Sequence, residues 1–226
     1  MAAHTKIIDL FGLPACGKTT LSTYIFEKYG GYHKITTMSR LVKEAKLDGS
    51  HLRKSISLRY FFAGLRLRLL APFDKIHKEI PVLNWPSHAR YYCYAKKYSD
   101  YDVVLVDHGD IQDFVSLERG VDLHINKRFS DSCARYIDQS LATNYVYCNI
   151  EPEVALERMQ NRGRKTGRID VIGDEEEQLQ ALKSEKKRFD YFAEMLKAKR
   201  RNMVELEMDK PIEVIVQELL EKLKDY

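Results

Sequence analysis

Residues 12–19 constrain this chain more than any other part of the sequence. They read GLPACGKT and match the pattern G-x-x-x-x-G-K-[ST]. An apolar run, KIIDLF, precedes the segment, and a helical pattern starts at Lys18. A glycine-rich turn between a strand and a helix directs backbone N–H groups and the helix N-terminus at one anion. The segment therefore predicts a phosphate-binding loop in an α/β protein.

Short apolar runs alternate with longer periodic segments along the rest of the chain, as in βαβ units around a parallel sheet. Strands are predicted at residues 6–11, 34–37, 102–106, 145–150 and 203–208. Helices are predicted from Lys18 to about Lys28, from Ser39 onward, and after Pro211. No Pro/Gly/Ser-rich linker divides residues 1–226. We expect a single domain with the P-loop NTPase fold, in which a five-stranded parallel sheet carries helices on both faces.

Residues 52–73 are the most membrane-like stretch of the sequence. Basic side chains interrupt this stretch, and each would be costly in hydrocarbon; they are Arg53, Lys54, Arg59, Arg66 and Arg68. On a helical wheel the apolar side chains share one face; they are Leu58, Phe61, Phe62, Leu65 and Leu69. The pattern predicts a helix that packs this apolar stripe on the sheet, with a membrane-surface helix as the alternative.

Composition narrows the classes of partner. The net charge of +4 and the pI near 8.7 are too mild to require a nucleic-acid polymer. The four cysteines lie far apart, which indicates neither a zinc site nor a disulfide framework. Lys6 and Asp9 interrupt the first apolar run, so it does not resemble a secretion signal. The expected protein is cytoplasmic and binds no membrane.

The backbone of the loop is expected to hold phosphate. Gly12 and Gly17 permit the required backbone geometry, and the amides of residues such as Ala15 and Cys16 would face phosphate oxygens. Cys16 itself has two interpretations. Helix-terminal amides can lower the pKa of its thiol and make it functional, or it is an ordinary loop residue.

The end of the loop carries the side chains for phosphate chemistry. Lys18 is expected to reach the β- and γ-phosphates of a nucleoside triphosphate, and the Thr19 hydroxyl is expected to ligate Mg²⁺. Thr20 either contacts another phosphate or caps its own helical turn. Lys18 and Thr19 therefore predict a bound Mg²⁺–triphosphate.

The sequence does not carry the further motifs of GTPases. A D-x-x-G motif is not formed at residues 107–110, because the glycine comes one place early. An N-K-x-D motif is not formed at residues 126–129, which read NKRF. The helical domain expected of AAA+ motors is not evident either, which argues against a mechanical ATPase.

Asp107 ends the third predicted strand, at the edge of the sheet where ligands bind in open α/β folds. A carboxylate at this place can hold Mg²⁺ or accept a proton from the acceptor hydroxyl. The next residue, His108, either titrates usefully or caps the following helix. Lys18 and Asp107 are therefore candidate catalytic residues, and Thr19 and Asp107 are candidate metal ligands.

Three segments resemble the P-loop kinases of nucleosides and nucleoside monophosphates, including the thymidylate kinase and deoxynucleoside kinase groups. They are the loop GLPACGKTT, the helix EPEVALERMQNRGR and the C-terminal stretch VELEMDKPIEVIVQELLEKL. The resemblance covers the phosphate loop and the C-terminal half of the chain. It implies an ATP-dependent phosphotransferase whose acceptor is a nucleoside or a nucleoside monophosphate. Kinases of this group often carry Asp-Arg or Glu-Arg where this chain has Asp107-His108.

By this resemblance, residues 158–173 form an arginine-rich lid. Arg158 would stack on the adenine, and Arg162, with Arg164 or Arg168, would neutralise charge on the phosphates. Arg158 and Arg162 are one helical turn apart and so share a face. The alternative is a solvated basic helix face followed by a surface loop.

The resemblance also implies which residues contact the acceptor and which lie against the adenine of the donor. Residues 36–100 would form a helical region that holds the acceptor, with Arg40 and Arg90 as candidate acceptor contacts. Asp209 and Lys210 would lie against the adenine through their backbone.

Two alternatives to a nucleoside or nucleotide kinase remain open. In the first, the protein is a P-loop kinase whose acceptor is a sugar, an antibiotic or a sugar nucleotide. In the second, it is a non-catalytic ATP-binding switch. The aromatic residues Tyr91, Tyr92 and Tyr94 either line a homodimer face or pack within the chain.

Overall fold

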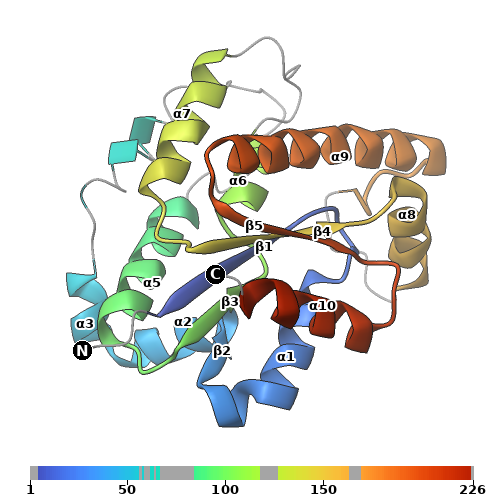
Figure 1. Cartoon of the computed structure of the whole chain (residues 1–226). Coiled ribbons are helices and arrows are strands. Elements are labelled where there is room, and N and C mark those ends of the chain that lie inside the picture. Colours follow the sequence, from blue (N-terminus) through green and yellow to red (C-terminus); the bar gives the residue numbers. More distant parts are fainter. Residues whose placement is uncertain are drawn as a thin grey trace.

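A five-stranded, all-parallel sheet forms the centre of the protein (Figure 1). The computed structural model describes residues 5–55, 58, 62–63, 65–66, 84–117, 127–162 and 169–224. The strand order is β2-β3-β1-β4-β5. The strands are β1 (Lys6–Phe11), β2 (Ile35–Thr37), β3 (Val103–Val106), β4 (Asn144–Asn149) and β5 (Asn202–Glu207). All five predicted strands are confirmed, with ends that differ by one residue or so from the sequence pattern.

Helices cover both faces of the sheet, as expected. In Figure 1, α6 and α9 lie on one side, and α1 and α10 lie on the other. The described helices are α1 (Lys18–His33), α2 (Met38–Leu47), α3 (Gly49–Lys54), α5 (Asn84–Tyr98), α6 (Asp110–Leu117), α7 (Lys127–Gln139), α8 (Pro152–Asn161), α9 (Glu175–Ala198) and α10 (Ile212–Lys224). Together with the sheet they confirm the P-loop NTPase architecture.

Helix α1 is longer than the sequence pattern indicated, because it continues through Gly30 and Gly31 to His33. Gly30 packs closely inside the protein. A Cβ atom there would lie 3.1 Å from the Phe26 ring and 3.2 Å from the carbonyl oxygen of Ile35. The glycine therefore serves helix packing here, and the turn into β2 follows at Lys34, which has a positive φ of 46°.

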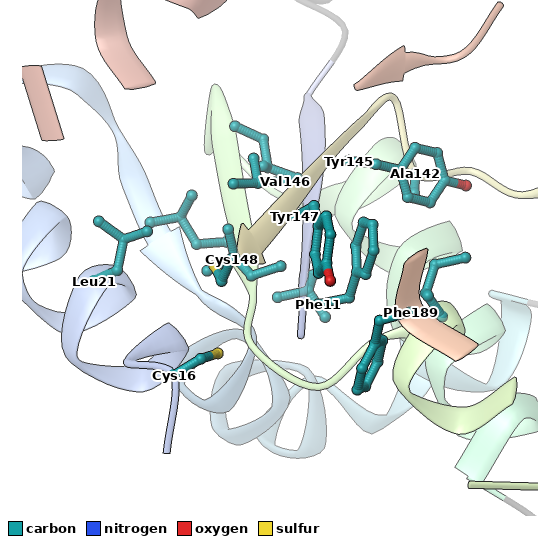
Figure 2. Packing of buried hydrophobic residues seen from close by; sticks show 14 of the residues in the cluster. Phe11, Cys16, Leu21, Ala142, Tyr145, Val146, Tyr147, Cys148 and Phe189 are labelled. Carbon is teal, nitrogen blue, oxygen red and sulfur yellow. The ribbon is translucent and has the colours of Figure 1, made fainter. Parts of the chain in front are cut away.

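Part of the hydrophobic core lies where β1 and β4 meet α9. Strand β1 is buried from Ile7 to Phe11, as expected for a central parallel strand covered on both faces. Phe11 stacks on Tyr147 of β4 with ring centroids 5.1 Å apart, and Phe189 of α9 lies 6.3 Å from Phe11 (Figure 2). Because Phe11 directly precedes the loop, this packing anchors the start of the loop to the sheet.

The apolar stripe predicted within residues 52–73 is not buried where the structure describes it. Leu58 is 69% exposed and Phe62 is 62% exposed, so the prediction that they pack on the sheet is wrong. Phe61 and Leu69 lie outside the described residues. A helical period places side chains on one face, but it does not supply the surface that would cover them. None of the described helices has the length and apolar character needed to cross a bilayer.

The aromatic cluster of α5 packs within the chain. Tyr92 and Tyr94 are buried, and Tyr91 packs partly against the core. The Tyr94 hydroxyl also donates a hydrogen bond of 3.2 Å to Asp48 at the end of α2. Of the two interpretations, internal packing therefore accounts for Tyr92 and Tyr94.

Candidate active site

The loop between β1 and α1 has the backbone geometry of an anion-binding turn. Gly12 and Gly17 have positive φ angles of 146° and 101°. At Gly12 a Cβ atom would lie 2.4 Å from the carbonyl oxygen of Cys148, so no larger residue fits there. Gly17 is the N-cap of α1, and no side chain caps that helix. The first amides of α1 therefore point toward the loop without a side-chain acceptor, which suits an anionic ligand.

The Lys18 side chain folds over the loop that precedes it. Its ammonium donates hydrogen bonds to the carbonyl oxygens of Gly12, at 2.8 Å, and Leu13, at 2.9 Å. It also lies 3.4 Å from the Sγ atom of Cys16. These contacts hold the positive charge above the turn, where an anion bound by the loop amides would meet it.

Thr19 and Asp107 meet across the edge of the sheet. The Thr19 hydroxyl donates a hydrogen bond of 2.8 Å to Asp107 Oδ2. They meet because β1 and β3 are paired in parallel, with Asp9 opposite Val106, so that the loop after β1 and the residue after β3 emerge together. A hydroxyl and a carboxylate oxygen are the ligands that Mg²⁺ prefers, with water completing its octahedron. Thr19 and Asp107 therefore fit a Mg²⁺ site.

His108 is tied to the first turn of α6. Its Nε2 atom lies 3.2 Å from Asp113 Oδ1, and its side chain is about half exposed. Of the two interpretations, contact with the following helix agrees with this geometry.

Asp9 was not identified by the sequence motifs, although it is the only acid in the apolar run KIIDLF. Its side chain is 0% exposed. Burial raises the pKa of Asp9 well above 3.8, the negative charge of Asp110 adds to this effect, and the amides of Ile111 and Asp110 oppose it. A sequence pattern could have identified Asp9, because a single carboxyl in a strand predicted to be buried on both faces is costly unless it has a role.

Arg158 joins α8 to the segment that follows β5. Its guanidinium donates a hydrogen bond of 2.9 Å to the carbonyl oxygen of Met208. Met208 is in turn bound through its amide to the carbonyl oxygen of Asn149, at the end of β4. Arg158 therefore lies next to Asp209 and Lys210, the residues expected to adjoin the adenine. The Lys210 ammonium is paired with Glu218, 3.1 Å away.

Arg162 is paired with an acid. Its guanidinium donates a hydrogen bond of 2.6 Å to Asp170, a nearly buried carboxylate. Arg164 and Arg168, the other expected lid arginines, lie outside the described residues. Where the structure describes the segment expected to form the lid, a charge pair thus anchors Arg162 to the residues before α9.

The two arginines expected near the acceptor lie on different helices. Arg40 of α2 places its guanidinium 4.0 Å above the ring of Phe26 in α1. Arg90 is an exposed residue of α5. Neither has a described hydrogen bond or ion pair with the loop or with Asp107, so their assignment to the acceptor stays a prediction.

Cys16 and Cys148 form a buried pair of thiols beneath the loop; both residues are labelled in Figure 2. Burial by itself raises the pKa of the Cys16 thiol, but a hydrogen bond from Cys148 and the nearby Lys18 ammonium lower it from 9.0 to about 6. Donating this hydrogen bond raises the pKa of Cys148. All four cysteines are free, in agreement with the absence of a predicted disulfide framework.

The low pKa of Cys16 predicts that stability depends on pH. Because the folded-state pKa lies below 9.0, the thiolate adds stability that is complete above pH 9.0 and is lost as the pH falls through about 6. We expect the free energy of unfolding of the wild type to rise over this range relative to that of Cys16→Ala. Urea titrations at a series of pH values measure it. Cys93→Ala, a buried thiol on α5, is the control, and parallel profiles for the wild type and Cys16→Ala would contradict the prediction.

Comparison with known proteins adds evidence on the fold. Neither a protein-family model nor a curated protein sequence matches the chain. Solved structures of deoxyadenosine kinase from M. mycoides do match it, at 14% sequence identity. The structure with dCMP and dCDP has a TM-score of 0.54 and covers 97% of this chain and 100% of that one. The structure with dATP has a TM-score of 0.54 and covers 96% and 99%. The structure with dCTP has a TM-score of 0.51 and covers 97% and 100%.

These likenesses extend over nearly the whole of both chains and define a P-loop kinase fold. More narrowly, the arrangement is that of the deoxynucleoside kinases. The resemblance first read from the phosphate loop and the C-terminal half is confirmed at the level of the fold. At 14% sequence identity the comparison shows the fold, and the residues of the site are the basis for proposing an activity.

Proposed function

We propose that the protein is an ATP- and Mg²⁺-dependent kinase of a small molecule, and that the acceptor is a nucleoside. The observation that carries this proposal is the hydrogen bond between Thr19 and Asp107, beside Lys18 and the loop amides. The loop and the residue after β3 thus supply a cationic side chain, a helix N-terminus and two oxygen ligands at the same edge of the sheet. Phosphoryl transfer from a nucleoside triphosphate requires these groups together.

On the donor side, the chain contributes positioning and positive charge. The loop amides and the Lys18 ammonium would hold the β- and γ-phosphates, and Thr19 and Asp107 would hold Mg²⁺. Bound Mg²⁺ would draw negative charge from the phosphate oxygens. Arg158 would form a wall of the adenine site with the backbone of Asp209 and Lys210, and Arg162 would approach the phosphates if its pair with Asp170 opened. Charge neutralisation in a water-poor site is the main source of catalysis in such reactions.

On the acceptor side, the Asp107 carboxylate could accept a proton from an acceptor hydroxyl. The matching solved structures are of deoxyadenosine kinase, an enzyme named for a nucleoside acceptor. We therefore favour a nucleoside over a nucleoside monophosphate. The nucleotides bound in the M. mycoides enzyme are consistent with a ligand of this class.

Release of ADP in the presence of a panel of acceptors tests the proposal. We expect turnover with Mg²⁺, ATP and one or more nucleosides, and little turnover with nucleoside monophosphates. A kinase of a sugar, an antibiotic or a sugar nucleotide would release ADP only with one of those compounds. Slow ATP hydrolysis that no acceptor changes would support a nucleotide-binding switch. Either of the last two results would overturn the assignment to nucleosides.

A further inference from the structure

Asp9 places a carboxyl group in the middle of the sheet. It lies in β1 between two neighbouring strands, opposite Val106 of β3 and Tyr145 of β4. The side chain is fully buried. An acid at such a position costs stability unless its oxygens are used by the structure around it. The surroundings of Asp9 therefore indicate what it does.

The carboxyl of Asp9 lies directly against the loop that carries Asp107. A Cβ atom built on Gly109 would lie 2.3 Å from Asp9 Oδ1 and 2.5 Å from Oδ2. Only a glycine allows the chain to approach the carboxyl so closely. The backbone two residues after Asp107 thus rests on this group, and its position depends on the shape of the Asp9 side chain.

The same carboxyl faces the N-terminus of α6. Burial raises the pKa of Asp9 most, and the nearby amides of Ile111 and Asp110 lower it, but neither carboxyl oxygen has a hydrogen-bond partner among the described residues. These are first-turn amides, which have no acceptor within their own helix. One side chain of β1 therefore contacts both the turn at Gly109 and the start of the helix that follows it.

Charge attraction does not explain why an acid stands here. Besides burial, which raises the pKa of Asp9 most, the charges of α6 that act on it are those of Asp110 and Asp113, and both raise it further. Asp110 is held by Ser140, at 2.8 Å, and by Tyr136, at 3.3 Å, both on or near α7. Asp113 lies against His108. The feature of Asp9 that the loop uses is the planar shape of its carboxyl, which packs closely against Gly109.

We propose that Asp9 is a positioning residue for Asp107. Its carboxyl fixes the backbone of residues 107–110, and this directs the Asp107 carboxylate toward Thr19, which it meets at 2.8 Å. The proposal rests on the proposed function, since it assigns Asp9 to the Mg²⁺ site of the same kinase. Residues behind metal ligands typically change metal affinity by about 10- to 100-fold when they are removed.

Calorimetric titration with ATP, in EDTA and in increasing Mg²⁺, tests this role without an acceptor. For Asp9→Ala we expect the gain in ATP affinity from Mg²⁺ to fall by about tenfold or more, with the affinity in EDTA nearly unchanged. Asp9→Asn keeps the planar shape and an acceptor oxygen, so it should keep most of the gain. Unfolding in urea shows how much stability each variant loses.

Gly109→Ala disturbs the same contact from the other side. Its Cβ atom would collide with the Asp9 carboxyl, so we expect the gain from Mg²⁺ to fall as in Asp9→Ala. Because both changes displace one loop, the double variant should lose less than the sum of the two single losses. If Asp9→Ala does not fold, the other two variants still test the proposal. It is supported if Mg²⁺ still raises the ATP affinity of Asp9→Asn but no longer raises that of Gly109→Ala.

Two results would overturn the proposal, and they differ from each other. In the first result, Mg²⁺ raises ATP affinity equally in the wild type, Asp9→Ala and Gly109→Ala. If Asp9→Ala does not fold, the same result is an equal gain in Asp9→Asn and Gly109→Ala. Asp9 would then support the fold alone. If the wild type binds no ATP with or without Mg²⁺, the proposed function itself is wrong. The wild-type titration therefore separates the two failures.

Discussion

Lys18→Ala is expected to lower the rate of phosphoryl transfer by about a thousandfold or more while the protein stays folded. The Lys18 ammonium is held over the loop by the carbonyl oxygens of Gly12 and Leu13. Without it, the negative charge that develops on the transferred phosphoryl group loses its nearest cation. Loss of the two hydrogen bonds should cost only about 1 kcal/mol of stability each. Release of ADP measures the rate, and calorimetry measures ATP affinity.

The matched control is Lys28→Ala, which removes a lysine from the same helix. Lys28 is exposed and lies 3.2 Å from the Tyr24 hydroxyl, away from the loop. We expect its rate and ATP affinity to equal those of the wild type. Circular dichroism should show the same helix content in both variants. Full turnover in Lys18→Ala would contradict the assignment of the loop to phosphoryl transfer.

Asp107→Asn is expected to lower turnover by about 100- to 1,000-fold. The amide keeps the size of the side chain and an acceptor for the Thr19 hydroxyl, so the hydrogen bond of 2.8 Å can persist. The change removes only the negative charge. Turnover measured against Mg²⁺ concentration and pH distinguishes the two roles of Asp107. A metal ligand predicts a higher Mg²⁺ requirement, and a general base predicts loss of the acidic limb of the pH profile.

Asp138→Asn serves as the control for Asp107→Asn. Asp138 is an exposed acid at the end of α7 and pairs with Lys199, 2.7 Å away. We expect its removal to change neither the rate nor the Mg²⁺ requirement, since surface ion pairs contribute little. Wild-type turnover in Asp107→Asn at every Mg²⁺ concentration and pH would show that this carboxylate takes no part in the reaction.

Local patterns in the sequence predicted the parts of the site that depend on neighbouring residues. The loop after β1 followed from its glycines and from Lys18 and Thr19, because phosphate binding needs these residue types in this order. The five strands followed from apolar runs that parallel sheets bury on both faces. Asp107 followed from its place at the end of one of these strands.

Contacts between distant segments were beyond such patterns. The buried stripe expected around Leu58 failed because the period of a helix does not say whether another element covers it. The stacking of Arg40 of α2 on Phe26 of α1 also depends on how two helices pack. The sequence patterns predicted no role for Asp9 in the site, because Gly109, against which it packs, is a hundred residues away in the sequence.

The sequence alone therefore determined that this chain carries a phosphate loop at the end of a buried strand, with an acid at the end of a later one. Tertiary structure decided that these two ends lie side by side, because it placed β1 between β3 and β4. It also decided which charges are already paired and which buried carboxyl the Asp107 loop rests on. The physical reason is that loop geometry and strand burial depend on residues close in the chain, whereas strand order and side-chain pairing depend on how the whole core packs.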